Sequence, residues 1–293
     1  MLRCIRSTKL SAFASLAPIH ENIRLKTVMK DRDSSLTRVK PVFDHLLRTD
    51  QSGSSWLARL LSLPVEGNVL SLPVGCSFTI KDHGWGSNEK KIDAPVSLLS
   101  WLIRHPRKPM SGILSSDPIK AKKRQQWLEG SPVRRIEALK LLRYNPNNEN
   151  WHVFEGQTQP DVFIETDDLV VVIEGKRTEQ TPTTKTKWMA GRHQMLRHLD
   201  CAQEIRGNKY LVGFFIVEGE GMSTEVPAKW LEYARDTIKP DAVLSSLPNR
   251  GPEEQKDITS AFIGVTTWQR VCKEFCDLGL NWQLLPDTIS KKS

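Results

Sequence analysis

Three charged side chains near the middle of the chain are of the types that can hold a divalent cation and act on a phosphate. Asp161 opens one short apolar run, and Glu174 and Lys176 close the next, with Gly175 between them. Successive side chains of a strand point to opposite faces, so Glu174 and Lys176 share one face. A charge that leaves water without a partner loses several kcal/mol of hydration, so three such groups at one point indicate a bound ligand.

A hairpin of two strands would bring these side chains together. The runs from Asp161 to Glu165 and from Leu169 to Ile173 are largely apolar and β-branched, as is typical of buried strands, and a polar turn separates them. If the two strands pair in register, the first residue of one lies beside the end of the other. We therefore expect Asp161 to lie close to Glu174 and Lys176.

A hard divalent cation is the ligand that suits this group best. Mg²⁺ takes oxygen ligands, commonly from one or two carboxylates, and completes its shell with water and phosphate oxygens. Lys176 would lie near the attacked phosphate, where its charge orients the nucleophile and offsets developing negative charge. We therefore expect Mg²⁺ or Mn²⁺ as the cofactor and phosphodiester hydrolysis as the reaction.

These residues resemble the signature of the PD-(D/E)xK phosphodiesterase superfamily, which includes many restriction endonucleases, repair nucleases and junction resolvases. Pro160-Asp161 is followed by twelve residues and then by Glu174-Gly175-Lys176. The resemblance implies a restriction endonuclease-like α/β core, in which helices flank a mixed central sheet. It also implies Asp161 and Glu174 as metal ligands and Lys176 as the catalytic lysine. The plain structural alternative is a surface hairpin with a weak salt bridge between Glu174 and Lys176.

The elements around the signature follow the order that the resemblance implies: a helix, three or more strands, a second helix and a further strand. We expect, in chain order, a helix at 132–144, a strand near 151–154, the hairpin, a helix at 186–205 and a strand at 209–217. Glu137 lies on the first of these helices, from which many members of the superfamily supply another metal ligand. Pairing of Glu137 with Arg134 or with a lysine is an equally open role.

The second helix carries Gln194 and, four residues later, His198. One branch of the superfamily has glutamine and tyrosine at this spacing, so the resemblance implies an auxiliary catalytic role for Gln194, while His198 departs from the pattern. We expect Arg192 on the same helix to contact phosphate oxygens, the alternative being an ordinary exposed position. No dinucleotide-binding fingerprint is present, and we expect the residues from His83 to Gly86 to form a loop.

The positive charge of the chain is concentrated in one stretch. The 293 residues carry 42 basic and 34 acidic side chains, a formal net charge of +8. Residues 101–144 contain eleven lysines or arginines against three acids, which accounts for the whole excess. A polyanion would be attracted there, so DNA is the expected partner and RNA stays open. The expected nucleic-acid contacts, besides Arg192, are Lys122, Lys123, Arg124, Arg134 and Arg135.

Composition and length set the outer bounds. Hydrophobic residues make up 39% of the chain, enough for one large domain or two small ones. We expect an amino-terminal helical and mixed region of unknown role at 1–100, a basic connecting segment at 101–130 and the nuclease-like domain at 131–293. No apolar run approaches the roughly eighteen residues that span a bilayer, so no membrane contact is expected.

The amino-terminal residues superficially suggest a targeting peptide. They contain Arg3, Arg6 and Lys9 and no acid among the first twenty residues. The apolar run from Leu10 to Ile19 is short and interrupted by serines, and the odd number of cysteines favours a reducing compartment. We therefore expect a cytoplasmic protein.

The predicted function is that of a metal-dependent deoxyribonuclease, with endonuclease action and a homodimer implied by the resemblance. One alternative is a nucleic-acid-binding protein on the same fold with weak or no catalysis. Another is a scaffold whose basic stretch binds a protein partner. The response of DNA binding and cleavage to Mg²⁺ or Mn²⁺ separates the three.

Overall fold

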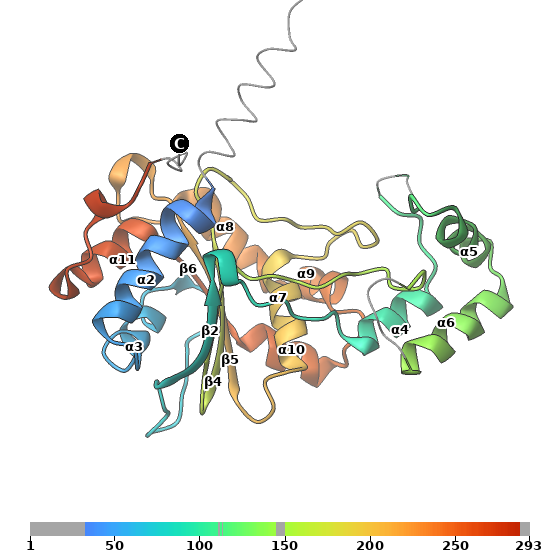
Figure 1. Cartoon of the computed structure of the whole chain (residues 1–293), viewed down its shortest axis with the longest axis horizontal. Helices are drawn as coiled ribbons and strands as arrows, with labels where there is room; N and C mark the ends of the chain where they lie inside the picture. The colour runs from blue at the N-terminus through green and yellow to red at the C-terminus, as the bar shows by residue number, and fades with distance from the viewer. Residues whose placement is uncertain (1–32, 111, 113, 145–149, 288–293) are drawn as a thin grey trace, which may run out of the picture.

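A computed structural model describes residues 33–110, 112, 114–144 and 150–287 (Figure 1). The segment considered above for a targeting peptide lies outside these residues. In chain order the main elements are η1 (Ser35–Val39, a π-helix), α2 (Lys40–Thr49), α3 (Leu57–Leu61), β1 (Val65–Glu66), β2 (Ile80–Trp85), α4 (Val96–Arg104), α5 (Pro118–Leu128), α6 (Pro132–Tyr144), β3 (Val162–Thr166), β4 (Leu169–Gly175), α7 (Gln194–Gln203), β5 (Tyr210–Val217), α8 (Ala228–Thr237), α9 (Pro240–Ser246), α10 (Pro252–Ser260), β6 (Phe262–Thr267) and α11 (Trp268–Glu274).

A six-stranded mixed sheet forms the centre of the molecule, with the strand order β1-β6-β5-β4-β3-β2. Strands β2, β3 and β4 form an antiparallel meander. Strands β4, β5 and β6 are parallel to one another, and the short β1 pairs antiparallel with β6 at the other edge. The predicted α/β class, with a mixed sheet flanked by helices, is therefore confirmed.

The apolar residues of the central strands explain the three layers. Strand β4 is buried along its whole length, and its alternate side chains enter two separate cores. Val171 and Ile173 pack in the core that contains residues of α2, α3 and α11. Val170 and Val172 pack in the core that contains residues of α7, α8 and α10. The helices thus cover both faces of the sheet, as Figure 1 shows.

The helices α4, α5 and α6 form a helical unit at one end of the molecule (Figure 1). They have a core of their own, in which Trp127 stacks on Phe154 with ring centroids 4.3 Å apart. The helix predicted at 132–144 is confirmed as α6. It packs in this unit and not on the sheet, where α2 is the helix that precedes the meander.

Other sequence predictions differ from the structure in instructive ways. Residues 151–154 are not a strand but an irregular segment buried in the helical unit. The helix expected at 186–205 begins only at Gln194. The expected loop from His83 to Gly86 is largely strand β2, whose polar residues conceal its strand pattern because β2 is an edge strand.

Residues of the expected amino-terminal region complete the sheet of the expected nuclease-like domain. Strand β2 pairs with β3, and β1 pairs with β6. Phe43 of α2 and Trp268 of α11 are fully buried in the same core. Within the described part of the chain, no helix has the length and apolar character needed to cross a membrane.

Candidate active site

The hairpin of β3 and β4 brings Asp161, Glu174 and Lys176 together. Val162 pairs with Ile173, so Asp161 lies beside Glu174, and the predicted register is confirmed. Asp161 Oδ2 accepts a hydrogen bond from the Gly175 backbone N–H at 2.8 Å. Lys176 Nζ donates to Glu174 Oε1 at 2.9 Å. The three side chains singled out from their spacing thus share one end of the hairpin.

The chain around Gly175 is held tightly where the parallel strands end. The Lys176 N–H donates to the Ile216 carbonyl at 2.8 Å, and the Trp268 indole N–H donates to the Lys176 carbonyl at 3.2 Å. A Cβ on Gly175 would lie 2.7 Å from a methyl group of Val39 and 2.8 Å from the ring of Trp268. Glycine is therefore needed for close packing against η1 and α11. Ligands of α/β proteins commonly bind beyond such carboxyl ends of parallel strands.

Glu174 is the best-connected member of the group and is only 4% exposed. Its Oε1 accepts from Lys176 and also from Gln194 Nε2 at 2.6 Å. Gln194 is the first residue of α7, and its Oε1 accepts from the Thr183 N–H at 3.3 Å. Burial alone would raise the pKa of Glu174, but the adjacent His198 and Lys176 outweigh burial and lower this pKa.

The other oxygen of Glu174 faces the ring of His198. Glu174 Oε2 lies 3.1 Å from His198 Nε2. Both atoms are buried, and neither takes part in a hydrogen bond of normal geometry. The second ring nitrogen, Nδ1, lies 2.7 Å from Thr158 Oγ1. The ring is thus held between the Thr158 hydroxyl and the Glu174 carboxylate.

The site contains more carboxyl groups than its lysine can neutralise. Burial, together with the negative charge of Glu174, raises the pKa of Asp161 to about 8, although Lys176 and the Gly175 N–H act in the opposite direction. A third carboxylate, Glu89, accepts a hydrogen bond from Ser35 Oγ at 2.8 Å. Burial and the charge of Glu174 raise the pKa of Glu89 as well. Such an excess of carboxylate is stabilised by a bound cation or by protonation.

The donor atoms fit a hard divalent cation. Glu174 Oε2 is a buried carboxylate oxygen without a hydrogen bond, and Asp161 adds a second carboxylate at the same point. Among the described residues, no three or more His, Cys, Asp or Glu side chains form a ready-made metal site. Mg²⁺ commonly needs only one or two carboxylates, because water and phosphate oxygens supply its remaining ligands. Asp161 and Glu174 are the residues that would hold it.

Glu137 lies in the helical unit, which Figure 1 shows at the far end of the molecule from the hairpin. Its carboxylate accepts from Lys123 Nζ at 2.7 Å and from Arg134 Nη1 at 2.5 Å. Partial burial alone would raise the pKa of Glu137, but these two partners outweigh it and lower the pKa. The structure thus gives Glu137 the ion-pairing role and does not bring it to Asp161.

The side chains predicted to contact nucleic acid differ in how far other groups of the protein already bind them. Lys122 is exposed, whereas Lys123 and Arg134 are paired with Glu137. Arg124 donates to the carbonyls of Trp151, Leu114 and Val153 and so holds chain segments of the helical unit together. Its guanidinium is occupied within the protein. Arg135 is half-buried.

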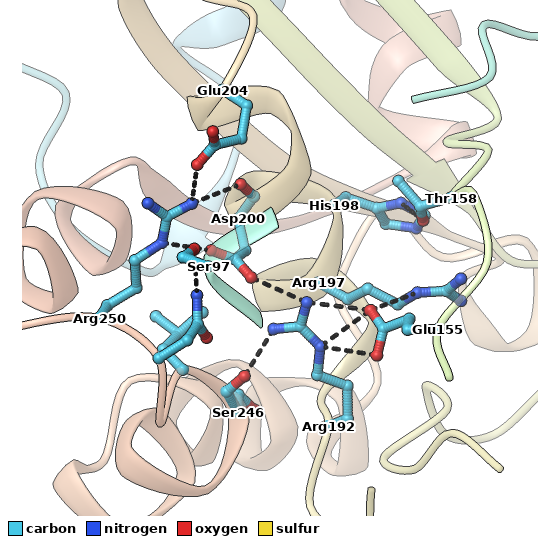
Figure 2. Close-up of polar contacts among 12 residues, drawn as sticks. Ser97, Glu155, Thr158, Arg192, Arg197, His198, Asp200, Glu204, Ser246 and Arg250 are labelled. Atoms are coloured by element: carbon cyan, nitrogen blue, oxygen red, sulfur yellow. Dashed lines mark hydrogen bonds and ion pairs between the residues drawn. The ribbon is translucent and has the colours of Figure 1, made fainter. Parts of the chain in front are cut away.

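Arg192 is fully buried, contrary to its predicted contact with phosphate and to the alternative of an exposed position. Figure 2 shows its guanidinium between Glu155, Asp200 and the Ser246 carbonyl. Its Nη2 donates to Glu155 Oε1 at 3.0 Å and to Asp200 Oδ2 at 2.8 Å. Arg250 binds the other oxygen of Asp200 at 2.7 Å. We call the side chains of Glu155, Arg192, Asp200 and Arg250 the ion cluster.

Sequence reasoning missed Glu89 and Thr158 and noted His198 only as a departure from tyrosine. Glu89 follows the edge strand β2 in a polar run that has no period of its own. Thr158 reaches the site because its backbone pairs with Ile92. Only the four-residue spacing of Gln194 and His198 signalled that both could face one point, since they lie about one helical turn apart.

The identification of this site depends on its own geometry. The group joins the ends of β3 and β4 to the first two turns of α7. Its carboxylates, lysine, glutamine and histidine lie within one network of short contacts. No protein-family model matches the chain, and no match is found among curated proteins or solved structures.

Proposed function

We propose that the chain is a divalent-metal-dependent nuclease that hydrolyses phosphodiester bonds of DNA. The observation that carries the proposal is the meeting of Asp161, Glu174 and Lys176 at one end of the hairpin, with an excess of carboxylate and a buried oxygen free of hydrogen bonds. Structural ion pairs rarely leave such atoms unsatisfied, because an unsatisfied buried polar atom destabilises the fold.

The topology supports the restriction endonuclease-like assignment. When α3, β1 and the helical unit inserted between β2 and β3 are set aside, the helix α2 is followed by the meander β2-β3-β4, then by α7 and then by β5, which lies parallel to β4. This is the order of helix, three strands, helix and strand that the PD-(D/E)xK resemblance implies. Asp161 immediately precedes the second strand of the meander, Glu174 lies on the third strand, and Lys176 immediately follows it.

Each residue has a role that its contacts support. Asp161 and Glu174 would hold Mg²⁺ or Mn²⁺, which when bound polarises a phosphate oxygen and promotes formation of hydroxide from water. Lys176 is charged, because the attraction of Glu174 outweighs its burial and raises its pKa. Its ammonium group would orient the nucleophile and offset charge on the attacked phosphate. Gln194 fixes the orientation of Glu174 by its 2.6 Å hydrogen bond.

The charge distribution supports DNA as the substrate. The net charge of +8 arises from residues 101–144, most of which belong to α4, α5, α6 and their connections. Exposed lysines of this helical unit would attract the phosphate backbone without reading the sequence of the bases.

The alternative is a nucleic-acid-binding protein without catalysis. It is favoured by the nearly complete burial of Glu174 and Lys176 and by the lack of a ready-made three-ligand metal site among the described residues. A pure binding protein would bind DNA equally well with and without Mg²⁺ or Mn²⁺.

The decisive experiment incubates the protein with supercoiled plasmid, linear duplex, single-stranded DNA and RNA, with and without Mn²⁺. Nicking of the plasmid only in the presence of metal is the expected result. Asp161→Ala should abolish cleavage and leave DNA affinity largely unchanged. Asp167→Ala is the matched control, because Asp167 is an exposed residue in the turn of the same hairpin. Full activity of a folded Asp161→Ala variant would contradict the proposal.

A further inference from the structure

A tight turn, formed by residues 129–131, joins α5 to α6 in the helical unit. Gly130 has a φ of +86°, a backbone conformation that favours glycine. Its N–H donates to the Trp127 carbonyl, and the Ser131 N–H donates to the Gln126 carbonyl, both at 3.0 Å. This pair of hydrogen bonds closes the end of α5 as a Schellman motif. Because α6 begins at the next residue, the turn fixes the direction of α6 relative to α5.

Side-chain contacts between the two helices hold α6 in place. Lys123 of α5 donates to Glu137 of α6 at 2.7 Å, and Arg134 of α6 donates to Gln126 of α5 at 2.7 Å. Ala138 on the inner side of α6 is fully buried in the core of the helical unit. The ion pair of Glu137 thus has a structural purpose, because it helps to present the opposite side of α6 to the surroundings.

That opposite side is exposed and partly apolar. We call it the outward face of α6, and it comprises the exposed side chains of Val133, Ile136, Lys140, Arg143 and Tyr144. Val133, Ile136 and Tyr144 are 69%, 66% and 79% exposed. These positions lie on one side of the helix, because residues three or four apart share a face. A helix that is apolar on both sides is usually covered on both, and grouped exposed apolar side chains mark an interaction surface.

The chemistry of the outward face fits the major groove of duplex DNA. The exposed Lys140 and Arg143 lie on this face, and α6 belongs to the segment 101–144 that holds the whole excess of positive charge. The major groove is about 12 Å wide and admits an α-helix, whose diameter with side chains is about 10–12 Å. It offers hydrogen-bond acceptors and the apolar methyl group of thymine between two phosphate backbones. A face that combines basic and apolar side chains is complementary to that surface.

The order of the elements is that of a helix-turn-helix. In this arrangement a short turn, often with glycine, joins two helices, and the first residues of the second helix meet base edges in the major groove. Val133 and Ile136 lie near the start of α6, and Figure 1 shows α5 and α6 at the outer end of the helical unit. The unit joins the sheet beside the candidate active site, because Ile92 pairs with Thr158, whose hydroxyl lies 2.7 Å from His198 Nδ1.

We propose that α5 and α6 form a helix-turn-helix, and that the outward face of α6 reads base sequence in the major groove of duplex DNA. Val133 and Ile136 contact thymine methyl groups, while Lys140 and Arg143 donate to acceptors of the groove and its phosphates. This inference rests on the proposed DNA substrate and deepens it, because it adds sequence selectivity to the general attraction of phosphates.

The first test selects bound duplexes from a random library with the full-length protein in the presence of a chelator, which prevents metal-dependent cleavage. Enrichment of a sequence that contains thymine is the expected result. Fluorescence anisotropy at one salt concentration then compares the selected duplex with single-base-pair variants. Each change at a contacted position should weaken binding by about fivefold to 100-fold.

The second test combines a protein variant with a base analogue. Replacement of a contacted thymine by deoxyuridine removes only the methyl group and should weaken binding to the wild-type protein by about threefold to fourfold. In Ile136→Ala the same replacement should have no further effect, because the side chain that covers the methyl group is gone. Val133→Ala tests the neighbouring contact in the same way. Ile119→Ala is the matched control, because Ile119 is 70% exposed on α5, and it should keep the full effect of deoxyuridine.

The outcomes separate this inference from the proposed function. Equal binding of all duplexes would overturn sequence reading and leave the proposed nuclease intact. A full deoxyuridine effect in both Val133→Ala and Ile136→Ala would remove α6 from the base contacts. Sequence-selective binding without cleavage in Mn²⁺ would support reading by α6 and overturn the proposed nuclease. Failure to bind duplex DNA, with self-association that is lost in Ile136→Ala, would overturn the inference and assign the outward face to a second copy of the chain.

Discussion

Two groups of buried charges each include a residue of helix α7, Asp200 in one and His198 in the other, and they differ in how completely their polar atoms are satisfied. In the ion cluster of Glu155, Arg192, Asp200 and Arg250, both oxygens of each acid accept hydrogen bonds and no side-chain atom lacks a partner. In the candidate active site, Glu174 Oε2 and His198 Nε2 are left without hydrogen bonds. The same helix thus contributes residues to one closed network and to one open network.

The difference indicates what each network does. A buried ion pair stabilises a fold only when further hydrogen bonds satisfy its remaining atoms, as the Ser246 carbonyl does for Arg192. If the proposed metal site is correct, the open network keeps binding capacity for the cation. Burial of charge alone would not have separated the two groups, because Arg192 and Glu174 are both almost fully buried.

The largest expected effect is on stability and comes from breaking the closed network. Arg192→Met should lower the free energy of unfolding by about 3 to 5 kcal/mol, because Glu155 and Asp200 would lose their shared cation. Urea denaturation measures this change. Arg197→Met is the control at a neighbouring arginine; the Arg197 side chain is 26% exposed and its Nε lies 3.4 Å from Glu155 Oε1, so its loss should cost less than about 1 kcal/mol. Equal effects of the two substitutions would refute the contrast.

The open network should respond to metal instead. Mn²⁺ at about one hundred times its dissociation constant should raise the free energy of unfolding by about 2.7 kcal/mol, because it binds only the folded state. Thermal unfolding with and without Mn²⁺ measures the gain. Glu174→Gln should abolish the gain, and Asp167→Asn should retain it. A gain that survives in Glu174→Gln would place the metal elsewhere.

A smaller and opposite effect is expected for Asp161 in metal-free protein. The folded state raises the pKa of Asp161 to about 8 from an ordinary value near 4, so its ionisation destabilises the fold progressively as the pH rises through this interval. Asp161→Asn should therefore stabilise the protein by about 1 to 3 kcal/mol at pH 9, discounted for residual hydration of the carboxyl.

The pH dependence supplies the control for that prediction. At pH 4 to 5 the carboxyl of Asp161 is protonated in the folded state, and the stabilisation by Asp161→Asn should largely vanish. Thermal unfolding in the presence of a chelator at both pH values tests it. A variant that is less stable than wild type at pH 9 would show that Asp161 serves the fold and not a ligand.

The smallest expected effect is on the salt dependence of DNA binding, and it concerns the helical unit. Lys122 is exposed, whereas Lys123 is engaged by Glu137. If Lys122 contacts a phosphate, Lys122→Gln should lower the slope of log affinity against log salt concentration by about 0.9. Fluorescence anisotropy with duplex DNA measures the slope. Lys123→Gln should change the slope less than Lys122→Gln does. A larger change for Lys123→Gln would show that pairing within the protein does not limit contact with DNA.

The hairpin and its register were predictable because their determinants are local. The apolar runs, the polar turn and the period of two all lie between Asp161 and Lys176, so no distant partner was needed to bring the three side chains together. The strand β5 and the helix α6 were also found close to their expected positions, because their apolar patterns are strong.

The remaining features depend on partners that are distant in the chain. Arg192 resembles a surface residue in its own segment, but its partners Glu155 and Ser246 are 37 and 54 residues away. Glu137 lies on a true helix, yet that helix belongs to the helical unit and not to the sheet. The place of Glu89 depends on the edge strand β2, whose pairing with β3 no local pattern indicates.

The helical unit enters and leaves the molecule at a single point between two neighbouring strands. Trp85 pairs with Val162, Ile92 pairs with Thr158, and Gln157 Nε2 donates to Asp93 Oδ1 at 2.9 Å. The two ends of this long insertion are therefore adjacent, so a short turn can replace it without separating β2 from β3. The helical unit is in this sense a replaceable insertion, and the hairpin of β3 and β4 does not depend on it for its pairing.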